Sequence, residues 1–200
     1  MDKSRLEAFS DGVIAILITI MVLELRAPHG SGWAALRGVV PSILTYVLSF
    51  VFLGIYWNNH HHLLQATDQI NGATLWANLH LLFWLSLVPF VTSWLGDNHH
   101  AAVPTAVYGV VLLCCGLAYT ILLRTILAAQ GGRNARLAAA VGSDFKGKLS
   151  LAVYVAAIPL SFVHQAIADA LYVIVVLMWL VPDPRIESRL GESRGHESIR

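Results

Sequence analysis

The stretch that decides the fold is RLEAFSDGVIAILITIMVLEL, residues 5–25. It is long and apolar enough for a transmembrane helix, which needs about 20 mostly apolar residues. Asp11 nevertheless lies about two turns into this stretch. Carboxylates within membrane segments are costly and usually face the interior of the protein. The first question is therefore which side of this helix carries Asp11 and which side is apolar.

A helical projection separates two faces of this segment. At about 100° per residue, Phe9, Ile20 and Leu23 fall within about 40° of Ile16. Asp11 falls about 140° from Ile16, on the opposite side. An apolar stripe on a membrane helix faces lipid, the protein core or a symmetry axis, and periodicity does not choose among them.

The composition indicates an integral membrane protein. Of 200 residues, 56% are hydrophobic and 12% are charged, whereas soluble domains carry about 25% charged residues. The mean hydropathy is +0.65. The net charge of +1 gives no indication of a nucleic-acid partner. The two cysteines, Cys114 and Cys115, are adjacent in an apolar run and are expected to pack as small hydrophobic residues.

Six segments are long and apolar enough to predict an all-α membrane protein. The expected helices are 7–25, 39–59, 74–95, 103–127, 149–164 and 167–181. The last two are short, so a re-entrant hairpin is the alternative there. We expect one transmembrane domain, residues 1–182, which contains a flexible basic connector at 128–148. The polar tail, residues 183–200, is expected to be disordered.

The basic residues predict the orientation. If the N-terminus is cytoplasmic, all but two of the 13 Lys and Arg residues fall in cytoplasmic segments, the two exceptions being Arg26 and Arg37. The positive-inside rule therefore favours both termini in the cytoplasm. We expect a multi-pass protein of the cell (plasma) membrane, with the lipid bilayer as a partner.

The first segment also resembles a known family. Arg5 followed by Phe9, Ser10 and Asp11 is similar to the hallmark of the transmembrane protein 175 family of potassium channels. YWNNHHHLL (56–64) and LWANLHLLFWLSLVPFVTSWL (75–95) resemble the second and third helices of its prokaryotic members. The resemblance implies a homotetramer in which the first helix lines a central pore for potassium ions.

The resemblance implies residue roles on this helix. A hydrophobic constriction would fall on Ile16, Ile20 and Leu23, with Thr19 as a polar residue flanking it that tunes selectivity. The hydroxyl of Thr19 could instead bond the backbone of its own helix. A TVGYG filter does not occur in the sequence, because VYG at 107–109 lacks the rest of that signature.

Asp11 is then expected to point away from the pore and into its own subunit, among polar residues of neighbouring helices. The resemblance implies that such residues support the pore helix structurally and do not act as ion ligands. The expected network comprises Arg5, Phe9, Ser10, Asp11, His60, His61, Asn78, His80 and, as an N–H donor, Trp84.

The histidines suggest an alternative. The runs at 60–62 and 99–100 invite a metal site, yet consecutive helical residues point about 100° apart and cannot converge on one ion. We therefore expect no metal, no cofactor and no enzyme activity. A membrane-embedded His-based metalloenzyme or a proton-coupled carrier is the alternative hypothesis.

Overall fold

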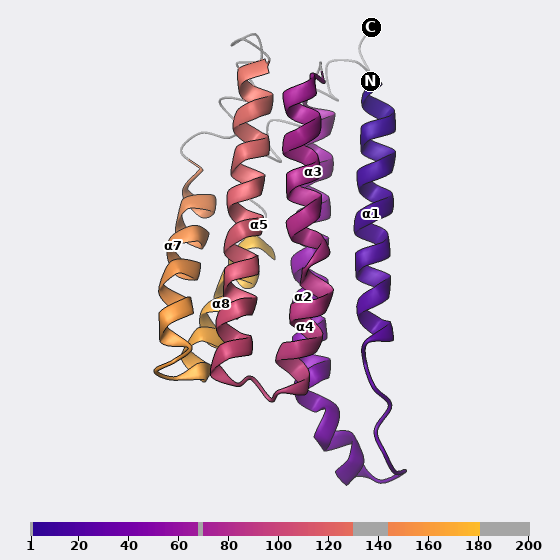
Figure 1. Ribbon diagram of the computed structural model, residues 1–200, viewed down its shortest axis with the longest axis vertical. Helices are drawn as coiled ribbons and strands as arrows, with labels where there is room; N and C mark the ends of the chain where they lie inside the picture. The colour runs from indigo at the N-terminus through magenta and orange to yellow at the C-terminus, as the bar shows by residue number, and fades with distance from the viewer. Residues whose placement is uncertain (1, 68–69, 130–143, 181–200) are drawn as a thin grey trace, which may run out of the picture.

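The computed structural model describes residues 2–67, 70–129 and 144–180. The regular secondary structure of these residues consists of helices, which are joined by short connectors and form an elongated bundle (Figure 1). In chain order they are α1 (Lys3–Leu23), α2 (Trp33–Gln65), α3 (Gly72–Ser86), α4 (Val88–Asp97), α5 (Ala102–Ala129), α7 (Phe145–Leu160) and α8 (Gln165–Leu180).

These helices correspond to the six predicted membrane segments. Four stretches are long and apolar enough to span by length and composition: α1, α2, α3 together with α4, and α5. The last two segments are shorter, because α7 and α8 have 16 residues each. They pack against each other, and both pack against α5. The predicted six-helix, all-α membrane fold therefore agrees with the structure of the described residues.

The third predicted segment, 74–95, is wrong as a single continuous helix. It divides at Leu87 into α3 and α4. Pro89 accounts for the division, because proline has no N–H to donate to the carbonyl of Leu85 four residues earlier. The two pieces still run on as one apolar stretch, Gly72–Asp97.

The second segment is longer than the predicted 39–59. α2 has 33 residues, about 50 Å at 1.5 Å per residue. Its first turns extend beyond the other helices at the lower end of Figure 1. Pro41 lies inside this part of α2, and proline within a helix is a common cause of a bend.

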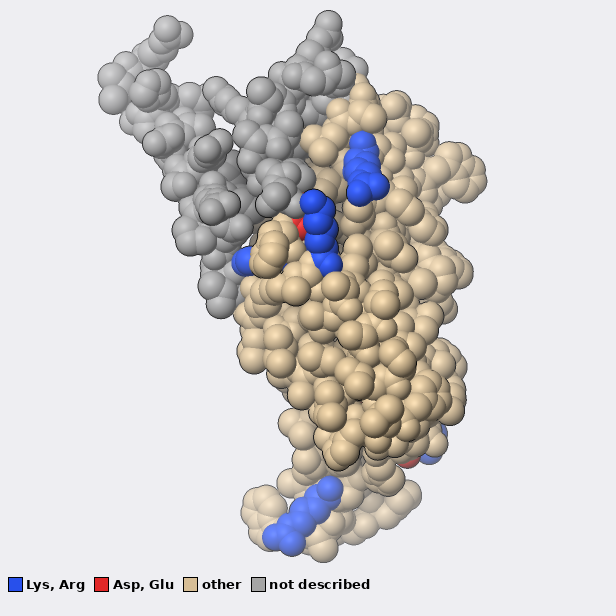
Figure 2. All heavy atoms as spheres, turned by 90° about the vertical axis from the view of Figure 1, so that its left-hand side faces the viewer, with Lys and Arg blue, Asp and Glu red and all other residues tan. Residues whose placement is uncertain are grey.

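The position of α1 in the bundle matters most for function. α1 lies at one edge, and α7 lies at the opposite edge (Figure 1). α1 packs against α2, α3 and α4, which leaves its outer side open. The side of the molecule seen in Figure 2 carries its lysines and arginines toward the two ends, with a broad belt of other residues between them. Such a belt suits a lipid-facing surface.

Two predictions concern residues that lie outside the described part of the chain. These are the disordered tail at 183–200 and most of the flexible connector at 128–148.

Candidate functional site

The packed face of α1 is formed by residues spaced three or four apart. This spacing places side chains on one side of a helix. The face contains one polar residue among apolar ones, and its buried members are Leu6, Ser10, Ile14, Leu17 and Met21.

The open face of α1 is apolar. Phe9 is 50% exposed, Ile16 57%, Ile20 39% and Leu23 80%. These four residues are the stripe that the helical projection separates from Asp11. In a single chain the stripe is free to face lipid or other copies of the chain.

A buried chain of hydrogen bonds fixes the packed face to α2 and α3. The Ser10 hydroxyl donates to the carbonyl of Leu6 at 2.8 Å, so its oxygen is left to accept. The Asn78 amide nitrogen donates to this oxygen at 2.9 Å. The Asn78 oxygen, 2.7 Å from His60 Nε2, then accepts from that ring nitrogen. Ser10, Asn78 and His60 are at most 1% exposed. Each group donates to the next, from His60 through Asn78 and Ser10 to the Leu6 carbonyl, and none of them is charged.

Asp11 is held by a separate contact. The Trp57 indole nitrogen donates to Asp11 Oδ1 at 3.0 Å. Asp11 is half-buried, and Trp57 stacks on His61 with ring centroids 5.9 Å apart. Asp11 thus points away from the open stripe and ties α1 to α2.

The structure brings together some members of the expected network and not others. Ser10, His60 and Asn78 meet as described. His80 accepts from Trp84 at 2.9 Å within α3, and His61 bonds Gln65 within α2.

The remaining two members of the expected network lie outside it. Arg5 is exposed on the first turns of α1, and Phe9 belongs to the open stripe. Sequence reasoning missed Trp57 as the partner of Asp11. The available signal was its spacing of three residues from His60, which puts both on the same side of α2.

Thr19 lies on the exposed side of α1. Its hydroxyl points at two carbonyls of its own helix, Ile16 at 2.9 Å and Ala15 at 3.1 Å. The single hydroxyl proton is therefore used by the backbone, while the oxygen lone pairs remain available.

A second interior network steadies α4, against which α1 packs. The Thr92 hydroxyl lies 2.7 Å from both the Ser49 hydroxyl and the Val88 carbonyl. Ser49 in turn lies 2.9 Å from the Tyr108 hydroxyl. α2, α4 and α5 are thereby joined at one level of the bundle.

The described residues hold no group of three or more His, Cys, Asp or Glu side chains placed to bind a metal ion. The histidine run at 60–62 spreads around α2: His60 is buried, His61 is half-buried and His62 is exposed.

Comparison with known proteins decides the family. The family model described as "Endosomal/lysosomal potassium channel TMEM175" matches residues 5–89. A potassium channel of Chryseobacterium sp. (strain P1-3) is 53% identical over 193 residues, which cover 96% of this chain and 100% of the relative. The chain belongs to the TMEM175 family.

Other similarities agree. A potassium channel of Streptomyces collinus is 36% identical over 126 residues, covering 59% of this chain and 61% of that protein. The crystal structure of a lysosomal potassium-selective channel TMEM175 homolog from Chamaesiphon minutus superimposes with a TM-score of 0.78. It is 25% identical and covers 90% of this chain and 96% of that chain.

Membership confirms the resemblance drawn from Arg5, Phe9, Ser10 and Asp11. It places this chain among prokaryotic TMEM175 potassium channels, which are membrane-embedded, and not among enzymes.

Proposed function

We propose that this protein is a potassium-permeable channel in which four copies of α1 surround the pore. Ile16, Ile20 and Leu23 form a hydrophobic constriction in this arrangement. The observation that carries the proposal is the open apolar face of α1, which has no covering helix among the described residues of its own chain.

A constriction of this kind works without ion ligands. Rings of branched apolar side chains close a pore by dewetting, and they offer nothing to replace the water around a dehydrated ion. Potassium therefore passes with much of its hydration shell when the ring widens.

The residues VYG at 107–109 do not provide a carbonyl filter in this proposal. They lie inside α5. Tyr108 is 0% exposed, and its hydroxyl is bonded to Ser49. Backbone carbonyls within a regular helix are used by the helix itself, which supports a pore built from α1 side chains.

The proposal includes an orientation and a location. Of the described basic residues, Lys3, Arg5 and Arg124 lie in the first turns of α1 or the last turns of α5. Figure 1 places these at the same end of the bundle. The positive-inside rule puts this end in the cytoplasm, with the protein in the plasma membrane and both termini inside.

The contacts of His61 and His80 give no support to a His-based enzyme site, because both side chains are bonded within their own helices. Membership in a channel family further argues against the enzyme.

Cysteine scanning tests the pore. In a Cys114→Ala, Cys115→Ala background, single cysteines at Ile16, Ile20 and Leu23 are modified with a charged thiol reagent in liposomes. Potassium flux is expected to change on modification at each position. Leu117→Cys is the matched control, because Leu117 is 45% exposed on α5, away from α1.

A second variant tests the direction in which potassium flux changes when the constriction becomes polar. Ile16→Asn is expected to raise basal potassium flux by about tenfold, which needs the barrier to fall by about 1.4 kcal/mol. An unchanged flux in Ile16→Asn, together with modification effects no larger than at Leu117→Cys, would show that the pore lies elsewhere.

A further inference from the structure

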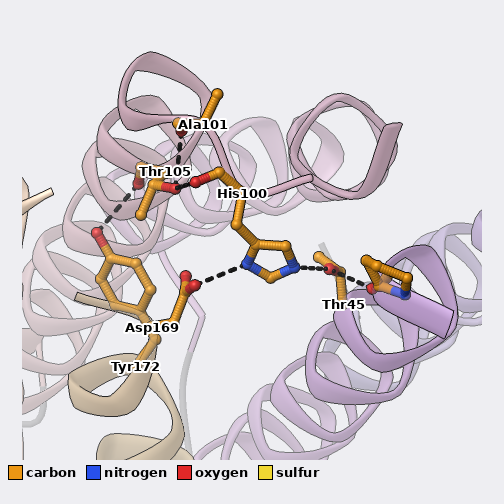
Figure 3. A network of polar contacts seen from close by, with 7 residues as sticks. Thr45, His100, Ala101, Thr105, Asp169 and Tyr172 are labelled. Carbon is orange, nitrogen blue, oxygen red and sulfur yellow. Dashed lines mark hydrogen bonds and ion pairs between the residues drawn. The ribbon is translucent and has the colours of Figure 1, made fainter. Parts of the chain in front are cut away.

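His100 joins three parts of the bundle at the end away from the N-terminus (Figure 3). It lies in the connector between α4 and α5, outside both helices. Its Nδ1 is 2.8 Å from Asp169 Oδ2 in α8. Its Nε2 is 3.0 Å from the Thr45 hydroxyl oxygen in α2. Each ring nitrogen therefore has an oxygen partner from a different helix.

The hydrogen-bond partners of this ring suit its protonated form. The Thr45 hydroxyl lies 2.9 Å from the Pro41 carbonyl, and while it donates there, its oxygen accepts from His100 Nε2. The Asp169 carboxylate likewise accepts from Nδ1. With both contacts made in this way, both ring nitrogens carry a proton, which is the imidazolium form. A neutral imidazole has one N–H and keeps one of the two contacts unless Thr45 releases Pro41.

The backbone holds the ring in place. His99 and His100 have φ values of 48° and 58°, in the left-handed region that non-glycine residues seldom adopt. The His100 N–H donates to the Leu95 carbonyl at 3.1 Å, and its carbonyl accepts from the Thr105 hydroxyl at 3.2 Å. Such conformations persist where the surrounding structure over-determines them.

Among the described residues around the pair, Asp169 is the acid that balances the ring. α8 contributes Asp169 and also Tyr172, whose hydroxyl donates to the Thr105 carbonyl at 3.1 Å. α5 contributes Tyr108, whose side chain is an uncharged phenol bonded to Ser49. α2 contributes a hydroxyl and a carbonyl without charge. The acid at the end of α4, Asp97, is paired with Arg26 at 3.6 Å.

These surroundings favour the protonated ring. The hydrogen bond to Asp169 raises the pKa of His100 above its ordinary value of 6.5, and the charge of that acid adds to the rise. Partial burial lowers the pKa, but by less than the acid raises it.

We propose that His100 and Asp169 form a pH-dependent latch that fastens α2 to α8 when the imidazole is protonated. Deprotonation removes one of the two N–H donors and the positive charge that faces Asp169, so the connector keeps both helices only if Thr45 gives up its bond to Pro41. The latch does not depend on the pore assignment, because it acts within one subunit.

The sign of the pH effect follows from the raised pKa. A group that binds its proton more tightly when folded stabilises the folded state fully below its unfolded pKa of about 6.5. This contribution is lost as the pH rises through the folded pKa. The folded protein is therefore expected to lose stability from mildly acidic to mildly basic pH.

The test measures Tm of the purified full-length protein at about pH 5.5 and about pH 8.5. The variants are His100→Asn and Asp169→Asn. The matched control is His99→Asn, since His99 is exposed, adjacent and also left-handed. Asparagine is among the residues that tolerate this conformation.

In the wild type and in His99→Asn, Tm is expected to fall between these pH values by about 2–4 °C more than in His100→Asn or Asp169→Asn. At the lower pH, the double variant that combines His100→Asn and Asp169→Asn is expected to lose no more Tm than either single variant. Such non-additive losses are typical of two residues that act as a pair. Equal pH dependence in His100→Asn and His99→Asn would overturn the latch. Equal losses of Tm at both pH values in His100→Asn and Asp169→Asn would overturn it too, because they would reveal a contact that does not titrate.

Discussion

The two faces of α1 are built from different chemistry, although they share the same turns of one helix. The packed face holds Ser10 in a neutral hydrogen-bond chain with Asn78 and His60, away from solvent. The open face carries branched apolar residues, of which Leu23 is 80% exposed. A single helix thus carries both an anchor and a surface that no other described helix of its own chain covers.

The difference suggests a division of labour. A buried polar group that loses its partner costs the full desolvation of that group, so damage to the anchor destabilises the folded protein. An exposed side chain has no such partner to lose. Changes on the open face are therefore expected to alter conduction in a protein that still folds.

The largest effect is expected from Asn78→Ala. This change removes the centre of the chain and leaves Ser10 and His60 buried without their shared partner. Each unpaired group costs about 1–3 kcal/mol. The yield of monodisperse protein and its Tm are expected to fall together.

Asn98→Ala is the matched control for Asn78→Ala. Asn98 is exposed and donates from its side chain to the Trp94 carbonyl of its own helix end. A near-normal Tm is expected there. Comparable stability of the two variants would show that the buried chain is not the anchor of α1.

The division between the faces was predictable from the sequence, because it follows from the helical period of one uninterrupted segment. Six apolar segments were predictable for the same reason. The division of the third segment at Leu87 was missed. Pro89 is a local signal for it, because proline has no backbone N–H to donate to the preceding turn of a helix. Length and hydropathy alone do not reveal a break in a helix when the segments on both sides of the break are apolar.

Partners across helices were harder to predict. The sequence placed Asp11 away from the apolar stripe and among polar residues of neighbouring helices, but Trp57, which donates to it, was not among the expected partners. The pairing of His100 with Asp169, 69 residues apart, has no spacing rule at all. Such contacts depend on how helices pack, which periodicity within one helix does not specify.

A smaller effect on the packed side is expected from Asp11→Ala. It removes the acceptor of the Trp57 N–H, and hydrogen bonds to charged groups contribute about 1.5–3 kcal/mol. Because Asp11 is half-buried rather than fully buried, water can replace part of this contact. The yield of the tetramer is expected to fall, with ion preference unchanged in the channels that assemble.

Asp11→Asn sharpens this result. It retains an oxygen that can accept from Trp57, so its yield is expected to lie between those of the wild type and Asp11→Ala. Normal assembly of Asp11→Ala with a switched ion preference would move Asp11 from the anchor into the ion pathway.

The smallest effect is expected at Thr19, on the open side one turn before Leu23. Its proton is used by the backbone carbonyls of Ile16 and Ala15, and this bond leaves the oxygen as an acceptor, the group that a cation requires. Thr19→Val keeps the shape and removes the oxygen. We expect the preference for potassium over sodium to fall by about twofold, or about 0.4 kcal/mol at 1.4 kcal/mol per factor of ten. The loss is small because a ring of hydroxyls replaces less of an ion's water than a ring of carbonyls does.

Reversal potentials in mixed potassium and sodium measure this loss of preference at Thr19, and Thr19→Ser, which keeps the oxygen, is the control. If Thr19→Val and Thr19→Ser give the same reversal potential as the wild type, the hydroxyl serves the helix backbone and the open face is apolar in function throughout.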